Sequence, residues 1–232
     1  MKIPGSTSGS GAPRVTVINK GVPGRTSLEA IAALDTYVLA LQPQRVILFF
    51  GMNDAMNSAK LVPLAEYDTA MRSMVRILAD AGVATVVLVT LNPVIELYVR
   101  ERHTQHPHRQ DLQGYLAEYD RAVRAIAAGE CLPLVDLRRI VEENGGTTIS
   151  ESCLIRCEAN GGGRDGVHLT AAAYAKLGME AFEVLKGCTE FGDQVVCFGD
   201  SLTYGGAVKG QGTSTGETYP AVLQRCFDKW SP

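Results

Sequence analysis

The sequence predicts a three-layer α/β/α sandwich built around a five-stranded parallel β-sheet. Five short runs rich in β-branched and apolar residues alternate with segments of helical periodicity, which is typical of right-handed βαβ crossovers. The runs are almost unbroken in apolar character, as in strands covered by helices on both faces. The five predicted strands span residues 15–19, 45–50, 84–90, 132–137 and 194–198.

Helical segments separate these strands, with apolar residues at the three- and four-residue intervals of an amphipathic helix. Pro43 ends the first helix, Gly82 stops the second, and Thr170 is placed to cap the fourth. The predicted helices span residues 26–41, 64–81, 112–128, 170–185 and 217–227. Residues 93–111 lack clear periodicity and residues 138–163 are rich in glycine, so both are predicted to be loops, and long loops of this kind often line a substrate site.

Composition and charge exclude several classes of protein. The 232 residues, 46% of them hydrophobic, are enough for one large core, and we expect one domain over residues 14–232 after a flexible Gly/Ser-rich tail at residues 1–13. The 22 Lys and Arg against 25 Asp and Glu give a net charge of −3, without the basic surplus of a nucleic-acid-binding protein. No apolar run approaches the ~20 residues that span a bilayer. No apolar export signal is visible, so we expect a soluble cytoplasmic protein of undetermined oligomeric state.

The six cysteines are too few for a disulfide scaffold. Cys197 lies in an apolar run and Cys226 in a helical one, so both are expected to be buried thiols. Cys153 and Cys157 share a loop, where the sequence leaves a disulfide open. Their spacing is not that of a zinc ligand pair, and no second pair accompanies them.

Candidate catalytic residues follow the predicted strands. Ligands of open parallel sheets bind at the carboxyl ends of the strands. Gly24 closes the turn after the first strand, Asn53 follows the second strand, and Ser201 follows the last one. Asp165 and His168 stand directly before the fourth predicted helix. Together these positions offer a nucleophile, backbone N–H donors, a carboxamide and a carboxylate–imidazole pair, which are the groups that acyl transfer requires.

The four sequence blocks that contain these residues, GVPGRT, GMND, DGVH and GDSL, resemble the signature blocks of the SGNH (GDSL-type) hydrolase superfamily. The resemblance spans residues 14–230 and implies the flavodoxin-like SGNH hydrolase fold. In that family the serine block comes first and the DxxH block last. Here the cyclic order is kept but Ser201 comes last, so the sequence looks circularly permuted. The usual ends would be joined by residues 187–193, which at about 3.3 Å each can span roughly 23 Å.

The resemblance implies a role for each residue. Ser201 is the nucleophile, His168 is the base that activates it and later protonates the leaving alkoxide, and Asp165 fixes the imidazole tautomer. The backbone N–H groups of Ser201 and Gly24 and the side-chain amide of Asn53 form the oxyanion hole. This chemistry needs no metal and no cofactor.

The predicted function is hydrolysis of short-chain acyl esters, with acetyl preferred, through an acyl-enzyme intermediate. The expected substrates are small-molecule esters or acylated carbohydrates. Two alternatives stay open: an acyltransferase or thioesterase using the same chemistry, and a catalytically silent carbohydrate-binding module on the same fold. A third, metal-dependent phosphoester hydrolysis, would use the histidine cluster at His103, His106 and His108, which is better interpreted as part of a solvated loop.

Other patterns near the blocks are interpreted as structural. Asp200 and Asp54 are expected to accept hydrogen bonds from nearby backbone N–H groups, and Gly21 to form a turn. Ser214 lies in a G-x-S-x-G string but lacks the preceding strand which that motif needs, so it is not a candidate nucleophile.

Overall fold

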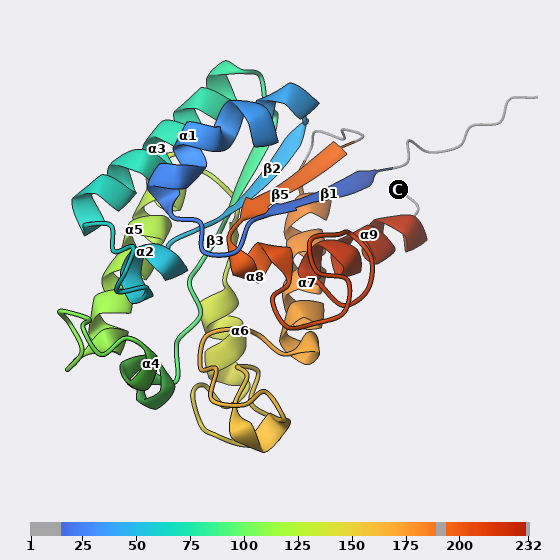
Figure 1. Cartoon of the computed structure of the whole chain (residues 1–232). Helices are drawn as coiled ribbons and strands as arrows, with labels where there is room; N and C mark the ends of the chain where they lie inside the picture. Colours follow the sequence, from blue (N-terminus) through green and yellow to red (C-terminus); the bar gives the residue numbers. More distant parts are fainter. Residues whose placement is uncertain (1–14, 189–193, 231–232) are drawn as a thin grey trace, which may run out of the picture.

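The structure, a computed structural model, describes residues 15–188 and 194–230 (Figure 1). In these ranges five parallel strands form one sheet in the order β1-β5-β2-β3-β4, which confirms the predicted three-layer fold. The tail predicted at residues 1–13 and most of the predicted link at 187–193 lie outside the described residues. The strands are β1 (Thr16–Gly21), β2 (Arg45–Phe49), β3 (Thr85–Val89), β4 (Leu134–Val135) and β5 (Gln194–Gly199).

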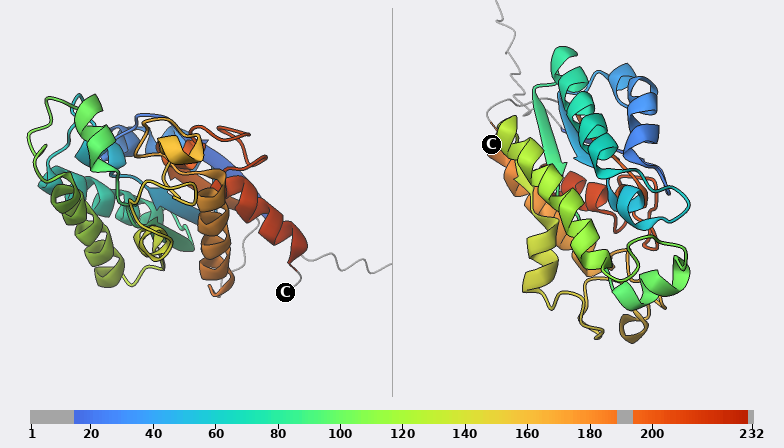
Figure 2. Two further views of the ribbon diagram at one scale, coloured as in Figure 1. Left: turned by 90° about the horizontal axis from the view of Figure 1, so that it is seen from below. Right: turned by 90° about the vertical axis from the view of Figure 1, so that its left-hand side faces the viewer.

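Helices cover both faces of the sheet. Helices α1 and α3 pack together over one face, and α7 and α9 pack together over the other (Figure 2). Thr26 forms a capping box with Glu29 at the start of α1, and Thr170 caps α7 as predicted. The helices are α1 (Ser27–Tyr37), α2 (Met52–Met56), α3 (Leu64–Asp80), α4 (Glu96–Arg102), α5 (Leu112–Gly129), α6 (Leu137–Glu143), α7 (Ala171–Lys186), α8 (Ser201–Tyr204) and α9 (Tyr219–Lys229), with 3-10 turns η1 (Leu39–Leu41) and η2 (Glu158–Asn160).

The register of the sheet brings three strand ends to one level. Gly199, the last residue of β5, pairs with Gly21 of β1 on one side and with Phe49 of β2 on the other. Strands β2 and β3 are buried along their whole length, so they are held from both faces. The loops that follow β1, β2 and β5 therefore start side by side at one rim, and these loops carry the predicted glycine, asparagine and serine blocks.

Both predicted loops contain a helix. Within residues 93–111 lies α4, which buries only Tyr98 and Val99, too few apolar residues to produce a periodic pattern. Within residues 138–163 lies most of α6, which begins where the fourth strand was predicted to continue, so β4 keeps only two residues. The carboxylate of Asp136 ends that strand because it caps α6, accepting the backbone N–H of Arg139 at 3.0 Å.

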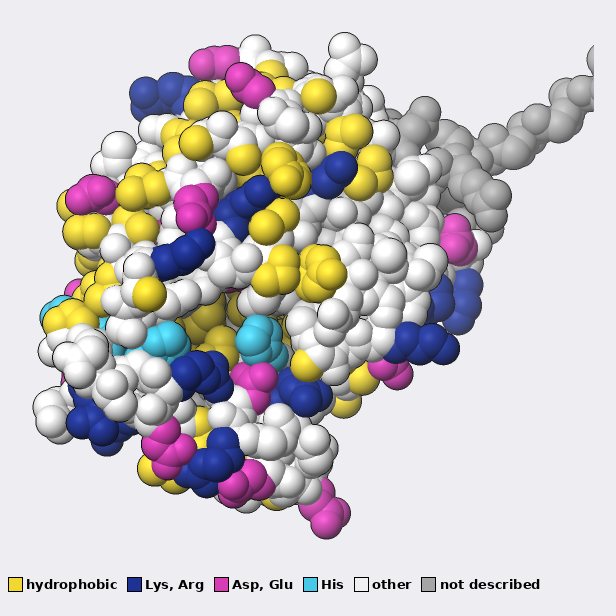
Figure 3. All heavy atoms as spheres, in the orientation of Figure 1, with side chains coloured by type: hydrophobic (Ala, Val, Ile, Leu, Met, Phe, Trp, Pro, Cys, Tyr) yellow, Lys and Arg dark blue, Asp and Glu magenta, His cyan; other side chains and the backbone are white. Residues whose placement is uncertain are grey.

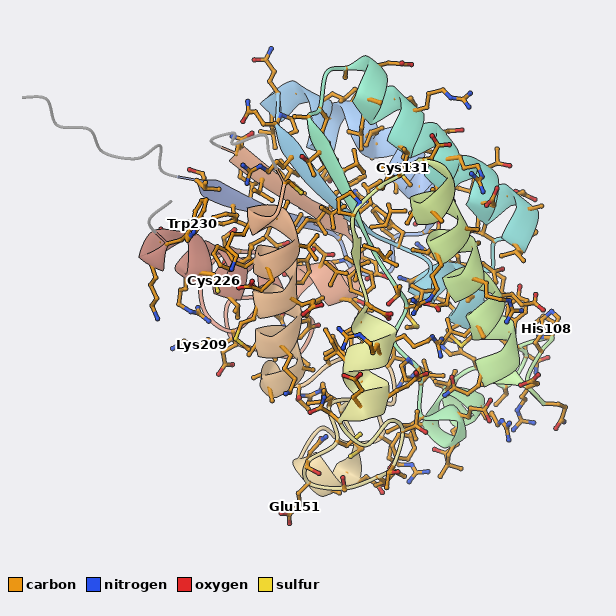
Figure 4. The ribbon with its side chains drawn as sticks, turned by 180° about the vertical axis from the view of Figure 1, so that it is seen from behind. His108, Cys131, Glu151, Lys209, Cys226 and Trp230 are labelled. Carbon is orange, nitrogen blue, oxygen red and sulfur yellow. The ribbon has the colours of Figure 1, made fainter. Side chains whose placement is uncertain are left out.

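All six cysteines are free thiols, so the disulfide left open between Cys153 and Cys157 is not formed, although both side chains are buried. Cys197 is buried in β5 as predicted. The prediction for Cys226 is wrong, because its side chain is half-buried: it lies beside the buried stripe of α9, which runs through Leu223 and Phe227 (Figure 4).

Candidate active site

Ser201 stands where the interior strand β5 turns into the short helix α8. A Cβ on Gly199 would lie 2.0 Å from the Thr203 hydroxyl oxygen and 2.7 Å from the Phe49 carbonyl oxygen, so only glycine allows this tight turn. Asp200 caps α8 by accepting the Leu202 N–H at 2.8 Å. The turn leaves Ser201 as the first residue of α8 with a half-buried side chain.

The structure brings Ser201, His168 and Asp165 together in one hydrogen-bonded chain. Ser201 Oγ lies 2.9 Å from His168 Nε2. On the other side of the ring, His168 Nδ1 lies 2.9 Å from Asp165 Oδ2. Asp165 Oδ1 accepts the backbone N–H groups of Val167 at 3.0 Å and of His168 at 2.8 Å, which holds the carboxylate against the loop. The three predicted side chains thus converge at the carboxyl end of the sheet.

The charge on Asp165 follows from these contacts. Burial by itself raises the pKa of the carboxyl, but the hydrogen bond and charge of His168 and the two backbone N–H groups outweigh it and lower the pKa to about 2. Asp165 is therefore ionised at neutral pH and can only accept hydrogen bonds.

An ionised Asp165 fixes the tautomer of the imidazole. His168 Nδ1 must carry the proton that it donates to the carboxylate, so a neutral ring leaves the lone pair on Nε2. That lone pair faces the Ser201 hydroxyl, which donates to it. The arrangement can therefore take up the serine proton as Oγ attacks an electrophile.

Gly24 and Asn53 lie beside the serine turn. Val22 donates its N–H to the Gly199 carbonyl at 3.0 Å, which ties the glycine turn to the end of β5. Gly24 has a φ of 75°, a conformation that favours glycine. Among the described residues, the backbone N–H groups of Gly24 and Ser201 have no hydrogen-bond acceptor, so both are available to a ligand.

The side chain of Asn53 connects the two turns. Its Nδ2 donates to the Arg25 carbonyl at 3.2 Å and to Asp200 Oδ2 at 3.0 Å. One of these two bonds must weaken if the amide is to donate to an oxyanion. Burial raises the pKa of Asp200 to about 7, although the bonds from Leu202 and Asn53 and the charge of His168 act in the opposite direction.

The neighbouring aspartates act structurally, as predicted. Asp54 accepts the backbone N–H of Ser27 at 2.9 Å and also its hydroxyl, which joins α2 to the start of α1. Asp200 caps α8. Gly21 was predicted to form a turn, and this is wrong: it ends β1, and a Cβ there would lie 2.1 Å from the backbone nitrogen of Tyr204 in α8.

Two arginines that the sequence analysis did not select hold the loop of Asp165 and His168. Arg156 donates its backbone N–H to the His168 carbonyl at 2.8 Å, and its Nε lies 3.9 Å from Asp165 Oδ2. Arg102, at the end of α4, donates from Nη2 to the carbonyls of Arg164 at 3.2 Å and of Asp165. These contacts join segments up to 63 residues apart, so no local sequence pattern predicts them.

The three histidine side chains make different polar contacts, although the His108 N–H donates to His106 Nδ1 at 3.1 Å. His103 Nδ1 lies 3.1 Å from the Ser58 hydroxyl oxygen, and His106 Nε2 lies 2.7 Å from the Ala55 carbonyl oxygen. His108 stacks on Tyr115, with ring centroids 3.9 Å apart, at the edge of the molecule (Figure 4). The prediction of a solvated loop is wrong for His106, which is buried. Within residues 15–188 and 194–230, no three His, Cys, Asp or Glu side chains gather in a way that could hold a metal ion.

Figure 3 shows a hollow on the face seen in Figure 1, with histidine, acidic and basic side chains along it. None of the helices described is both long and apolar enough to cross a membrane.

Comparison with known proteins identifies the family. The family model of the GDSL-like lipase/acylhydrolase family matches residues 6–176, which include Gly24, Asn53, Asp165 and His168 and end before Ser201. The chain belongs to this family. No curated protein matches the sequence.

Solved structures of distantly similar proteins show the same fold. A lipase/acylhydrolase from Enterococcus faecalis is 24% identical, with a TM-score of 0.55 over 71% of this chain and 72% of that one. The acetyl xylan esterase AlAXEase is 18% identical, with a TM-score of 0.54 over 72% and 79% of the two chains. A mutant of Axe2, an acetylxylan esterase from Geobacillus stearothermophilus, is 21% identical, with a TM-score of 0.52 over 70% and 68%.

Proposed function

We propose that this acylhydrolase is a serine carboxylester hydrolase that cleaves short-chain acyl esters, with acetyl preferred, through an acyl-enzyme intermediate. One observation carries the proposal: the unbroken chain from Ser201 Oγ through the imidazole of His168 to the carboxylate of Asp165. When the imidazole is neutral, the ionised carboxylate of Asp165 holds the Nδ1 proton and the Nε2 lone pair is free to take the serine proton.

In the first half of the reaction, Ser201 Oγ attacks the ester carbonyl carbon while its proton passes to His168 Nε2. The negative charge that develops on the carbonyl oxygen is stabilised by the free N–H groups of Ser201 and Gly24 and by the Asn53 amide. The ester C–O bond then breaks, and Nε2 returns the proton to the leaving alkoxide. The acyl group stays on Ser201.

In the second half, water replaces the alcohol. His168 Nε2 takes a proton from the water as its oxygen attacks the acyl carbon. The bond to Ser201 Oγ breaks, Nε2 gives the proton back to the serine oxygen, and the carboxylic acid leaves. Asp165 stays ionised throughout and stabilises the imidazolium formed in both halves.

The preference for short acyl groups has two supports. No long apolar segment that could act as a lid over a fatty acyl chain stands out in the sequence. Two of the solved structures with this fold are named as acetylxylan esterases. Small acetate esters and acetylated carbohydrates are therefore the proposed substrates.

The test is hydrolysis of 4-nitrophenyl acetate by wild type, Ser201→Ala and the matched control Ser214→Ala, with folding checked by circular dichroism. We expect the Ser201 variant to lose at least 10³-fold in kcat/KM and the control to keep wild-type turnover. A folded Ser201→Ala protein with undiminished turnover would overturn the proposal. Transfer of the acetyl group to an added alcohol in preference to water would identify the acyltransferase variant instead.

We also propose that the order of the four blocks is a circular permutation of the family order. The interior position of β5, between β1 and β2, supports it, because the strand of the serine block then has the same neighbours whichever end comes first. Gln224 of α9 bonds to Val15 and Val17, so the two ends of the described chain lie together. A chain cut within residues 189–193, with its present ends linked, should fold and keep its activity. Failure of that chain to fold with several linker lengths would contradict the permutation.

A further inference from the structure

A basic side chain lies at the rim of the candidate site on the side of His168. Arg102 ends α4, and its Nη2 donates to the carbonyls of Arg164 and Asp165. The next residue, His103, contacts Ser58 in the loop that follows α2. The end of α4 therefore bridges the loop of Asp165 and His168 and the loop that follows α2.

The charge of Arg102 is not neutralised by a neighbouring carboxylate. Among the described residues no Asp or Glu oxygen lies within ion-pair distance of its guanidinium, whereas the adjacent Arg164 is paired with both Glu101 and Glu158. Only Nη2 has partners in the described part of the chain, so the N–H groups on Nε and Nη1, three of the five donors, stay free. Arg102 is exposed, so these donors can reach a bound molecule.

The proposed chemistry decides which part of a substrate lies near this arginine. His168 must protonate the leaving oxygen, so the alcohol part of the ester lies on the His168 side of the site. Arg102 is bonded to the backbone of Asp165, the residue that holds the His168 ring. Arg156, on the same loop, has its Nε 3.9 Å from Asp165 Oδ2, so its charge is already paired with that carboxylate, unlike the charge of Arg102. The proposed acetyl group is too small to carry a charged substituent itself.

We propose that the substrates of this enzyme are esters whose alcohol part carries a carboxylate, and that Arg102 is the residue that binds it. The proposal rests on the proposed esterase function. The guanidinium plane presents parallel N–H donors that match the two oxygens of a carboxylate, which lysine cannot reproduce with one ammonium group. The carboxylate takes no part in bond making, so Arg102 determines specificity and does not act in the chemical steps.

The experiment compares two acetate esters of the same shape, 4-acetoxybenzoate and 4-acetoxybenzamide. Each rate is divided by the alkaline hydrolysis rate of its ester, which removes the difference in leaving-group reactivity. A charge-assisted hydrogen bond contributes about 10- to 100-fold in affinity, so we expect wild type to prefer the carboxylate by that factor in kcat/KM. The preference should lie mainly in KM and should fall in 0.5 M salt, roughly as expected for a partly exposed charge pair.

Arg102→Ala should remove the preference, Arg102→Lys should restore part of it, and the control Arg121→Ala, on the exposed surface of α5, should leave it unchanged. Because the ratio between two substrates is measured, a general loosening of the Asp165 loop cancels. Equal normalised kcat/KM for both esters in wild type, or an equal loss for both in Arg102→Ala, would overturn the inference while the esterase proposal stands. If wild type hydrolyses neither these esters nor 4-nitrophenyl acetate, the esterase proposal itself fails.

Discussion

Asp165→Asn changes the two contacts of Oδ2, which are the hydrogen bond to His168 Nδ1 and the 3.9 Å ion pair with Arg156 Nε. The asparagine keeps an oxygen at the position of Oδ1, so the backbone N–H groups of Val167 and His168 retain their acceptor. At the position of Oδ2 it puts an NH₂ group, 2.9 Å from His168 Nδ1 in the present structure. Nδ1 lies closer to this NH₂ position than to Oδ1, which is 3.1 Å away, so we expect the ring to accept at Nδ1 and to carry its proton on Nε2. There it faces the Ser201 hydroxyl with a donor instead of a lone pair.

The expected loss in kcat follows from this tautomer change. A histidine in the wrong tautomer cannot take the serine proton, and a change of this kind in a Ser-His-Asp triad costs roughly 10⁴-fold in kcat, or about 5.5 kcal/mol in activation free energy. The stability cost is smaller. The pKa of Asp165 is lowered from 3.8 to about 2, which corresponds to about 2 kcal/mol of stability at neutral pH. That loss leaves a domain of ordinary stability folded.

The assay is steady-state hydrolysis of 4-nitrophenyl acetate, with the fold checked by thermal unfolding. The matched control is Asp111→Asn, where the aspartate caps α5 by accepting the Gly114 N–H at 2.9 Å and asparagine is an equally good cap. The control should keep both activity and stability. An Asp165→Asn variant that is folded and retains activity within tenfold of wild type would refute the role assigned to the carboxylate.

Two further variants test the neighbouring groups. Asn53→Ala should lower kcat by about 10²- to 10³-fold with little change in KM, because an oxyanion donor acts in the transition state. Equal losses in substrate binding and in kcat would argue against that role. Asp200→Asn should remove a pH dependence of the free energy of unfolding. The pKa of this carboxyl is raised from 3.8 to about 7 in the fold. Its contribution to stability is therefore full below pH 3.8 and is lost as the pH rises through 7. Urea unfolding of wild type relative to the variant should show a fall of about 4 kcal/mol at most between pH 4 and 7, and a flat difference would show that Asp200 does not bind the proton.

The sheet was predictable because its signals are local. Strands β2 and β3 are buried on both faces, so their sequences are almost entirely apolar, and Thr170 begins α7 with a side chain that caps it. The shortness of β4 was not predicted, because the side chain that ends it, Asp136, lies in a run that is otherwise as apolar as a strand.

Some residues of the candidate site were predictable from local sequence and others were not. Asp165 and His168 are three residues apart, so one loop brings them together. Ser201 joins them from the other end of the chain, and only the resemblance to a family pattern, with the strand order that it implies, connects the blocks before the structure is known. Arg102 bonds to backbone carbonyls 62 and 63 residues away, which leave no complementary side chain in the sequence to pair with it. Arg156 bonds to the carbonyls of Ala207 and Gly162 besides its contact with Asp165, and the first of these is 51 residues away.

The most direct test of the account is covalent labelling of the folded enzyme by a fluorophosphonate, followed by mass spectrometry of the peptides. A serine whose proton is taken by a tautomer-fixed imidazole should be phosphonylated stoichiometrically, with the added mass on Ser201 alone, and His168→Ala should be labelled at least 100-fold more slowly. A folded protein that stays unlabelled, or that carries the label on another serine such as Ser214, would contradict it.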